Sequence, residues 1–162
     1  MRLRPAGQSD WPAIWPILRE TFRAGETYAI DRDIKEAEAK AYWIDTAAAT
    51  FVAEDDGVIL GTYYIRRNQA GGGAHVCNCG YITSHAARGR GIARQMCEAS
   101  QQEALKLGFK AMQFNFVLAN NSAALALWEK LGFSTVGRLP RAFDHPRDGL
   151  IDALVLYKWL AD

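Results

Sequence analysis

Residues 84–96, Ser-His-Ala-Ala-Arg-Gly-Arg-Gly-Ile-Ala-Arg-Gln-Met, join a predicted strand to a predicted helix. The strand spans 74–83, where side chains alternate between two faces. The helix spans 91–107, where small and apolar residues fall on one stripe and a glycine follows the last turn. Gly89 and Gly91 lie at this junction and lack Cβ, so backbone N–H groups there can approach a ligand closely.

The junction has the chemistry of an anion site. Unpaired N–H groups and the helix dipole favour negative charge at a helix N-terminus. Arg88 and Arg90 add positive charge and can bind phosphate oxygens in a bidentate way. The segment is neither a Walker loop nor a complete Rossmann fingerprint, because the Lys and the third Gly of those motifs are missing. It predicts a phosphate or pyrophosphate site, with an ordinary turn as the alternative.

The elements around this junction alternate between strands and helices. We expect strands at 1–5, 50–54, 58–67, 74–83, 111–118, 133–138 and 150–159, and helices at 10–23, 33–45, 91–107 and 122–131. Asp55-Asp56-Gly57 predicts a hairpin turn between the second and third strands. This order predicts an α/β fold, a mixed sheet with helices on its faces, and residues 1–162 as a single domain.

Composition limits the partners and the setting. The formal net charge of +1 gives no reason to expect nucleic acid or an anionic membrane as partner. No apolar run approaches the ~18 residues of a membrane span, and no secretory leader is recognisable. Cys77, Cys79 and Cys97 cannot all pair and read as packing thiols rather than metal ligands. We therefore expect a reduced, cytoplasmic protein without a metal site.

A second motif follows the strand at 111–118. Residues 120–133 read Asn-Asn-Ser-Ala-Ala-Leu-Ala-Leu-Trp-Glu-Lys-Leu-Gly-Phe. Asn121 opens a helix whose Ala124 and Trp128 share one face. Taken alone, Asn121 is either a helix cap or a ligand contact, and Trp128 is either core or part of a site.

Together the two motifs resemble the signatures of the GNAT superfamily of CoA-dependent N-acyltransferases. Arg88-x-x-Gly91-x-Ala93 is similar to the family's pyrophosphate loop, and Asn121-x-x-Ala124-x-x-x-Trp128-x-x-x-Gly132-Phe133 is similar to its second signature. The resemblance implies a mostly antiparallel central sheet that splays at its middle strands, 74–83 and 111–118. Acetyl-CoA and an amine would meet in that slot.

The resemblance also implies roles for the matched positions. Backbone groups of Ile82 and Thr83 would pair with the pantetheine arm. Amides from the loop would hold the pyrophosphate, with arginines beside it; these residues are Arg88, Gly89, Arg90, Gly91, Ile92 and Ala93. Asn121 would contact the CoA arm, and Trp128 stands where many members carry a Tyr that protonates the leaving thiol. A homodimer, common in the superfamily, is compatible with the sequence.

The sequence departs from the family at both acid–base positions. Asn78 lies where many members place a Glu base, and the indole N–H of Trp128 is a very poor acid. Asn78 and Asn115 each interrupt an apolar strand, which is costly unless they are hydrogen-bonded. Either both are structural, or both face the slot and orient a small polar substrate while solvent or a backbone carbonyl receives the proton.

Over residues 60–155 the chain resembles a narrower group, the yeast-type L-azetidine-2-carboxylate (proline-analogue) N-acetyltransferases. That resemblance implies that Asn78 and Asn115 hold an amino-acid substrate. We therefore expect an acetyl-CoA-dependent N-acetyltransferase that acetylates a small amine by direct attack. The alternatives are a protein N-terminal or lysine acetyltransferase and a non-catalytic CoA-binding sensor.

Five other polar residues have a surface or structural interpretation as the default. His75 and His85 flank a strand and are expected at the surface. Glu26 and Tyr28 either lie at the surface or line an acceptor pocket, and the surface is favoured. Asp152 is expected to be a hydrogen-bonded structural carboxylate rather than a pocket group.

Overall fold

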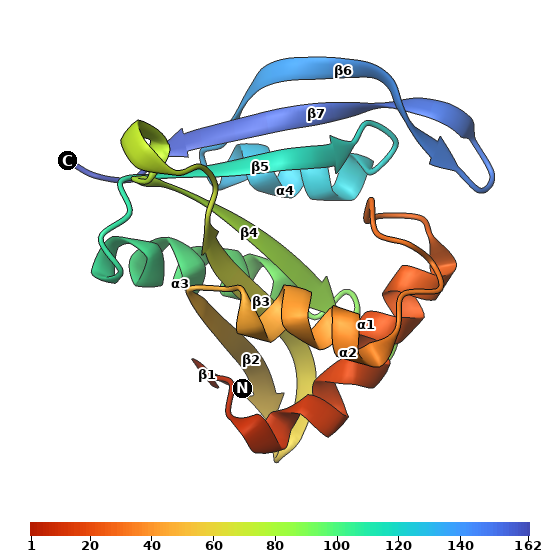
Figure 1. The fold of residues 1–162 in the computed structure, drawn as a ribbon, viewed down its shortest axis with the longest axis vertical. Coiled ribbons are helices and arrows are strands. Elements are labelled where there is room, and N and C mark those ends of the chain that lie inside the picture. Colours follow the sequence, from red (N-terminus) through yellow and green to blue (C-terminus); the bar gives the residue numbers. More distant parts are fainter.

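The computed structural model describes residues 1–162, which form one seven-stranded sheet in the order β1-β2-β3-β4-β5-β7-β6 (Figure 1). The strands are β1 (Arg2–Pro5), β2 (Ala49–Asp55), β3 (Val58–Arg67), β4 (Val76–Thr83), β5 (Ala111–Leu118), β6 (Ser134–His145) and β7 (Gly149–Trp159). The helices are α1 (Trp11–Ala24), α2 (Glu36–Lys40), α3 (Ile92–Lys106) and α4 (Ser122–Lys130). Only β4 and β5 pair in parallel, so the predicted mixed, mostly antiparallel sheet is confirmed.

Two elements differ from the sequence prediction. The helix predicted at 33–45 begins at Glu36 and ends in a π-helical turn, Ala41–Asp45. The strand predicted at 133–138 continues to His145 as β6, an edge strand that pairs with β7. Most of β6 is exposed, so it carries little of the apolar alternation by which a strand is recognised.

The sheet separates two apolar clusters. On one face, α1 and α2 cover β2 and β3 around the fully buried Ile14, Leu18 and Trp43. On the other face, α3 and α4 cover the sheet around Met96, Met112 and other side chains. None of the helices combines the length and the apolar composition that crossing a bilayer requires.

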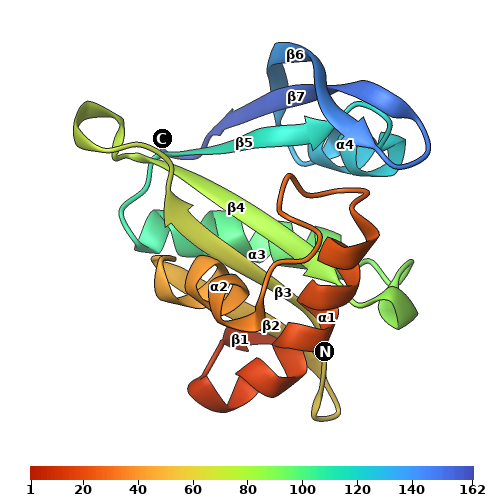
Figure 2. The same ribbon diagram turned by 45° about the vertical axis from the view of Figure 1, so that its right-hand side comes forward.

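The parallel pair β4–β5 is short. Only three residue pairs are in register, from Val76↔Ala111 to Asn78↔Gln113. Beyond them the strands diverge, as Figures 1 and 2 both show, and β5 carries an irregularity between Phe114 and Val117 where it pairs with β7. A bulge of this kind bends a strand, which directs β5 away from β4. The predicted splay at the middle strands therefore lies where the sequence placed it.

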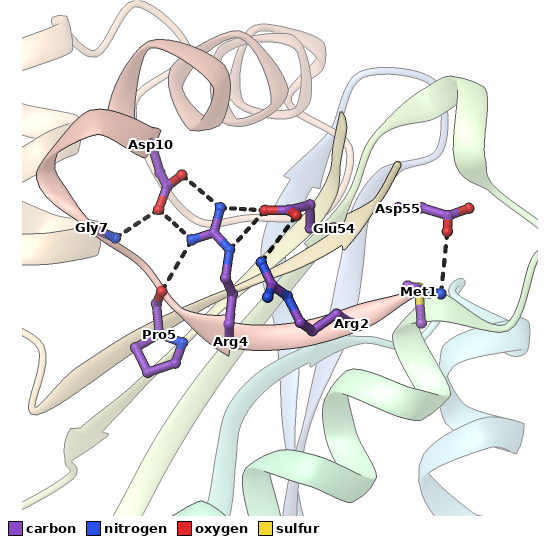
Figure 3. Close-up of polar contacts among 8 residues, drawn as sticks. All are labelled: Met1, Arg2, Arg4, Pro5, Gly7, Asp10, Glu54 and Asp55. Atoms are coloured by element: carbon purple, nitrogen blue, oxygen red, sulfur yellow. Dashed lines mark hydrogen bonds and ion pairs between the residues drawn. The ribbon is translucent and has the colours of Figure 1, made fainter. Parts of the chain in front are cut away.

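A cationic clamp fixes the first strand to the second (Figure 3). The guanidinium of Arg4 donates to both carboxylate oxygens of Asp10, at 2.7 and 2.9 Å, and its Nε donates to Glu54 at 2.7 Å. Asp10 also accepts from the backbone N–H of Gly7 at 2.6 Å. Mainly through its hydrogen bond, Arg4 lowers the pKa of Asp10 below the ordinary aspartate value.

This clamp predicts a pH-dependent loss of stability in Arg4→Met. A carboxyl with a depressed folded pKa stabilises the fold above its unfolded pKa, and that contribution disappears as the pH falls through the folded pKa. We expect a Tm lower by a few degrees at pH 7, and a gap to the parent that narrows below about pH 4.

Arg2→Met is the matched control, because Arg2 is exposed and pairs only with Glu54. Thermal melts of both variants between pH 7 and pH 2.5 give the comparison. A gap for Arg4→Met that stays constant over that range would contradict the assignment.

Candidate functional site

The ladder between β3 and β4 fixes which backbone groups face the splay. The N–H of Ser84, just after β4, donates to the carbonyl of Leu60 in β3, at 2.8 Å. The carbonyl of His75 instead accepts from the N–H of Lys110 at the start of β5, at 2.8 Å. No irregularity interrupts β3–β4 between these points. Even-numbered residues of β4 therefore turn their backbone groups to β3, and odd-numbered residues turn theirs to β5.

Beyond Asn78 this alternation leaves backbone groups facing the space that β5 has vacated. Tyr81 and Thr83 present theirs to the slot, whereas those of Ile82 face β3. The backbone contact predicted at Ile82 does not fit this direction, because Tyr81 and Thr83 are the residues whose backbone groups face the slot. The hydroxyl of Tyr28 donates to the carbonyl of Tyr81 at 3.0 Å, which shows that this carbonyl is open to a donor from the slot.

A cavity of about 430 Å³ occupies the splay. Eight of the residues predicted for the site line it: Asn78, Ile82, Thr83, Arg88, Ala93, Asn115, Asn121 and Trp128. Four lie in the loop outside its lining: Gly89, Arg90, Gly91 and Ile92. The cavity therefore joins the two asparagine-bearing strands to the start of α3 and the start of α4.

The glycine loop has the geometry of an anion cradle. Gly89 and Gly91 have φ values of +77° and +74°, and Gly91 is the N-cap of α3. A Cβ added at either glycine would meet nothing within 4 Å, so the space before the helix N-terminus is open. The N–H groups of this first turn have no partner within the helix and can donate to an anion such as a pyrophosphate.

The two arginines of the loop do different things. Arg88 lines the cavity. Arg90 instead donates to Asp55 at 2.8 Å, in the turn between β2 and β3. The pair is largely exposed, so it holds Arg90 only weakly. In this arrangement Arg88 is the arginine available to a ligand in the slot.

The second motif serves structure and site at once. Asn121 caps α4, since its Oδ1 accepts from the N–H of Ala124 at 3.3 Å, and it also lines the cavity. Trp128 is buried between Tyr81 and Phe114, with ring centroids 5.3 and 5.2 Å away, and it too lines the cavity. Asn121 is therefore a helix cap and Trp128 a core residue, and both also reach the cavity.

Asn78 and Asn115 line the same cavity, and both form hydrogen bonds with Gln113. The Nδ2 of Asn78 donates to the carbonyl of Gln113 at 2.9 Å, and the Nε2 of Gln113 donates to Oδ1 of Asn115 at 2.9 Å. Asn115 also donates to Asn68 at 2.7 Å. Both asparagines are thus hydrogen-bonded within the protein, and both present amide groups to the slot.

Four tyrosines that were not among the predicted site residues also line the cavity: Tyr28, Tyr42, Tyr64 and Tyr81. Tyr28, expected at the surface, comes from the loop after α1, while Tyr42 and Tyr64 come from the π turn and β3. A tyrosine between apolar residues gives no local signal of this role, because the contact depends on strand register and loop path.

The remaining polar candidates lie outside the cavity. Glu26 pairs with Arg147, and His75 and His85 are exposed. Asp152 accepts from the backbone N–H of Arg141 and the side chain of Arg138, which confirms its structural interpretation. The three cysteines are free and buried.

The lining contains no carboxylate and no imidazole. Burial raises the pKa of the hydroxyls of Tyr28, Tyr64 and Tyr81 and of the Cys79 thiol, so all four stay protonated at neutral pH. Burial also raises the pKa of Cys97 to about 11, which makes it a poor nucleophile. The site therefore binds and orients through neutral dipoles, with Arg88 as its one cationic side chain.

Known proteins are similar to this chain in fold and in sequence. The profile of the acetyltransferase (GNAT) family matches residues 11–133. The N-acetyltransferase aca1 of Schizosaccharomyces pombe is 30% identical over 148 residues, which cover 81% of this chain and 71% of that protein. The structure of a GCN5-related N-acetyltransferase from Kribbella flavida is 40% identical, has a TM-score of 0.93 and covers 98% of this chain and 97% of its own.

A phosphinothricin acetyltransferase from Sinorhizobium meliloti, solved in complex with AcCoA, has the same fold at 22% identity. Its TM-score is 0.87, and the match covers 99% of this chain and 88% of that one.

The open cradle predicts that Gly91→Glu abolishes CoA binding. A side chain at φ +74° strains the backbone, and its carboxylate would stand in the anion site. We expect affinity for CoA, measured by titration calorimetry, to fall about 100-fold or more. Gly108→Glu is the matched control, because Gly108 has φ +92° and open space at the other end of α3. Equal losses in both variants would refute the placement of the anion.

The different surroundings of the two arginines predict different effects on the same affinity. Arg88→Ala should weaken CoA binding roughly 10–100-fold, the range expected for a lost charge-assisted hydrogen bond. Arg90→Ala should change it by less than about threefold, because Arg90 lies outside the lining of the cavity and its guanidinium is directed to Asp55. A larger loss for Arg90→Ala than for Arg88→Ala would reverse the assignment.

Proposed function

This chain belongs to the acetyltransferase (GNAT) family, and from that premise we propose that it transfers the acetyl group of acetyl-CoA by direct attack to the amine of a small molecule. The observation that carries the proposal is the cavity between β4 and β5, which joins an anion cradle to a pocket of neutral polar groups. We further propose that residues 1–162 act as one N-acetyltransferase domain in the cytoplasm. A homodimer is compatible with this proposal.

The cofactor half of the site is assigned to one end of the slot. Amides of Gly89 to Ala93 at the start of α3 hold the pyrophosphate, with Arg88 beside them. Backbone groups of Tyr81 and Thr83 pair with the pantetheine arm in place of a strand. Asn121 and Trp128 contact that arm from α4. Acetyl-CoA supplies a thioester carbonyl that an uncharged amine attacks.

The acceptor half lies around Asn78 and Asn115. Their amides offer donors and acceptors to an amine or a carboxylate without supplying a base. The same pair supports the narrower proposal that the acceptor is an amino acid or a proline analogue. The lack of any carboxylate in the lining argues against a cationic lysine tail or a polyamine, which an acidic groove would favour.

Two alternatives are separated by one experiment. Release of free CoA thiol is followed with acetyl-CoA and a panel containing amino acids, proline analogues, polyamines and peptides with free N-termini or lysines. Acceptor-dependent release with an amino acid or proline analogue supports the proposal. Release only with peptides would favour the protein acetyltransferase, and tight CoA binding without acceptor-dependent release would favour the sensor.

The absence of a carboxylate or imidazole from the cavity lining predicts the pH profile. Because only the uncharged amine attacks and neither of these groups is there to act as a base, log kcat/KM should rise with unit slope and level off at the acceptor's own amine pKa. Two accepted amines whose pKa values differ by about one unit should give inflections displaced by the same amount. A common inflection for both acceptors would reveal an enzymic base and contradict the assignment.

A further inference from the structure

Tyr64 lies at the acceptor end of the cavity in a position that the family motifs do not describe. It pairs across the sheet with Gly80 of β4 and is only 2% exposed. A Cβ on Gly80 would lie 2.5 Å from Cε1 of the Tyr64 ring. The missing side chain at Gly80 therefore admits the ring over β4 and brings its hydroxyl to Asn78.

The Tyr64 hydroxyl is the centre of a short hydrogen-bonded chain. It donates to Oδ1 of Asn78 at 3.2 Å, and the hydroxyls of Tyr42 and Tyr64 are 3.1 Å apart. Because the hydroxyl proton of Tyr64 is used in the hydrogen bond to Asn78, Tyr64 cannot also donate to Tyr42. The Tyr42 hydroxyl is therefore the donor in the bond between the two tyrosines. The other end is fixed as well, because the Asn78 amide donates to Gln113. Both Tyr64 and Asn78 are thereby held in one orientation.

A cation holds the two rings in place. The guanidinium carbon of Arg66 lies 4.1 Å from the ring centroids of both Tyr42 and Tyr64, and its Nη2 donates to the carbonyl of Tyr42. The rings themselves meet edge to face, with centroids 5.7 Å apart. This positive charge, partly buried behind the acceptor end, disfavours a second cation there and favours an uncharged amine.

We propose that the oxygen of Tyr64 accepts a hydrogen bond from the N–H of the acceptor's uncharged amine and so directs the nitrogen lone pair toward the thioester. The inference rests on the proposed function and adds a substrate-contacting residue to it. The Tyr64 hydroxyl donates its proton to Asn78 and accepts from Tyr42 with one lone pair, so its second lone pair can only accept from a ligand and selects an N–H donor. Because Asn78 and Gln113 are already bonded to each other, they orient Tyr64 and leave its oxygen as the acceptor offered to the substrate.

The test is Tyr64→Phe, which keeps the ring and its contacts and removes the hydroxyl. We expect kcat/KM for the acceptor to fall about tenfold or more through a higher acceptor KM, while affinity for CoA stays within about twofold. Tyr63→Phe is the matched control. Tyr63 precedes Tyr64, faces the opposite cluster and has a buried hydroxyl without a hydrogen-bond partner, so its removal should leave turnover unchanged.

Binding of the acceptor to the CoA complex, measured by calorimetry, gives a readout that needs no turnover. Tyr64→Phe should weaken this binding, and Tyr63→Phe should not. Parent-like acceptor affinity and kcat/KM in a folded Tyr64→Phe would overturn the inference while leaving the proposed function intact. An acceptor panel that neither binds nor is acetylated by the parent protein would overturn both.

If Tyr64→Phe does not fold, Tyr42→Phe carries the test. It leaves the Tyr64 ring and its bond to Asn78 in place but removes the donor that orients the Tyr64 oxygen. The acceptor KM should then change severalfold with CoA affinity unchanged. An unaltered acceptor KM in this variant would overturn the inference.

Discussion

The parting of β4 from β5 after three residue pairs is the constraint on which the rest of the structure depends. A buried sheet normally satisfies its backbone groups with the next strand, and here the odd-numbered residues of β4 lose that partner. Tyr81 finds one donor in the Tyr28 hydroxyl, and the slot takes the place of the missing strand. A ligand with an extended amide-bearing arm can complete the ladder. The divergence of β4 from β5 therefore creates the proposed binding site.

An aromatic wedge keeps the two strands apart. Tyr81 belongs to β4, Phe114 to β5 and Trp128 to α4, and their ring centroids lie between 5.2 and 5.8 Å from one another. Pairs of this geometry add about 0.5–1.5 kcal/mol each beyond their burial. The indole of Trp128 therefore contributes packing area at the splay. Its N–H is a very poor acid, so the contribution of this side chain is to packing and not to proton transfer.

Local signals made the glycine conformation before α3 and the cap of α4 predictable. A glycine that needs φ > 0 before a helix, as at Gly91, is visible in the sequence because few other residues tolerate that conformation. The cap at Asn121 is local in the same way. Tyr64 was not predictable, since its place depends on pairing with Gly80 sixteen residues along the chain and on the register of that pair. The full length of β6 was missed because an exposed edge strand has no apolar face to reveal it.

The acceptor end combines neutral dipoles with cationic charge behind them, and this combination has a consequence for selectivity. Asn78, Asn115 and Tyr64 can hydrogen-bond to an ammonium as well as to an amine, so their dipoles alone do not discriminate between the two. Arg66 and Arg88 shift that balance, because bringing an ammonium into a partly buried site beside a fixed cation costs more than bringing an uncharged amine. Under the proposed function, such a site favours an acceptor amine that is already uncharged and does not require a carboxylate in its lining.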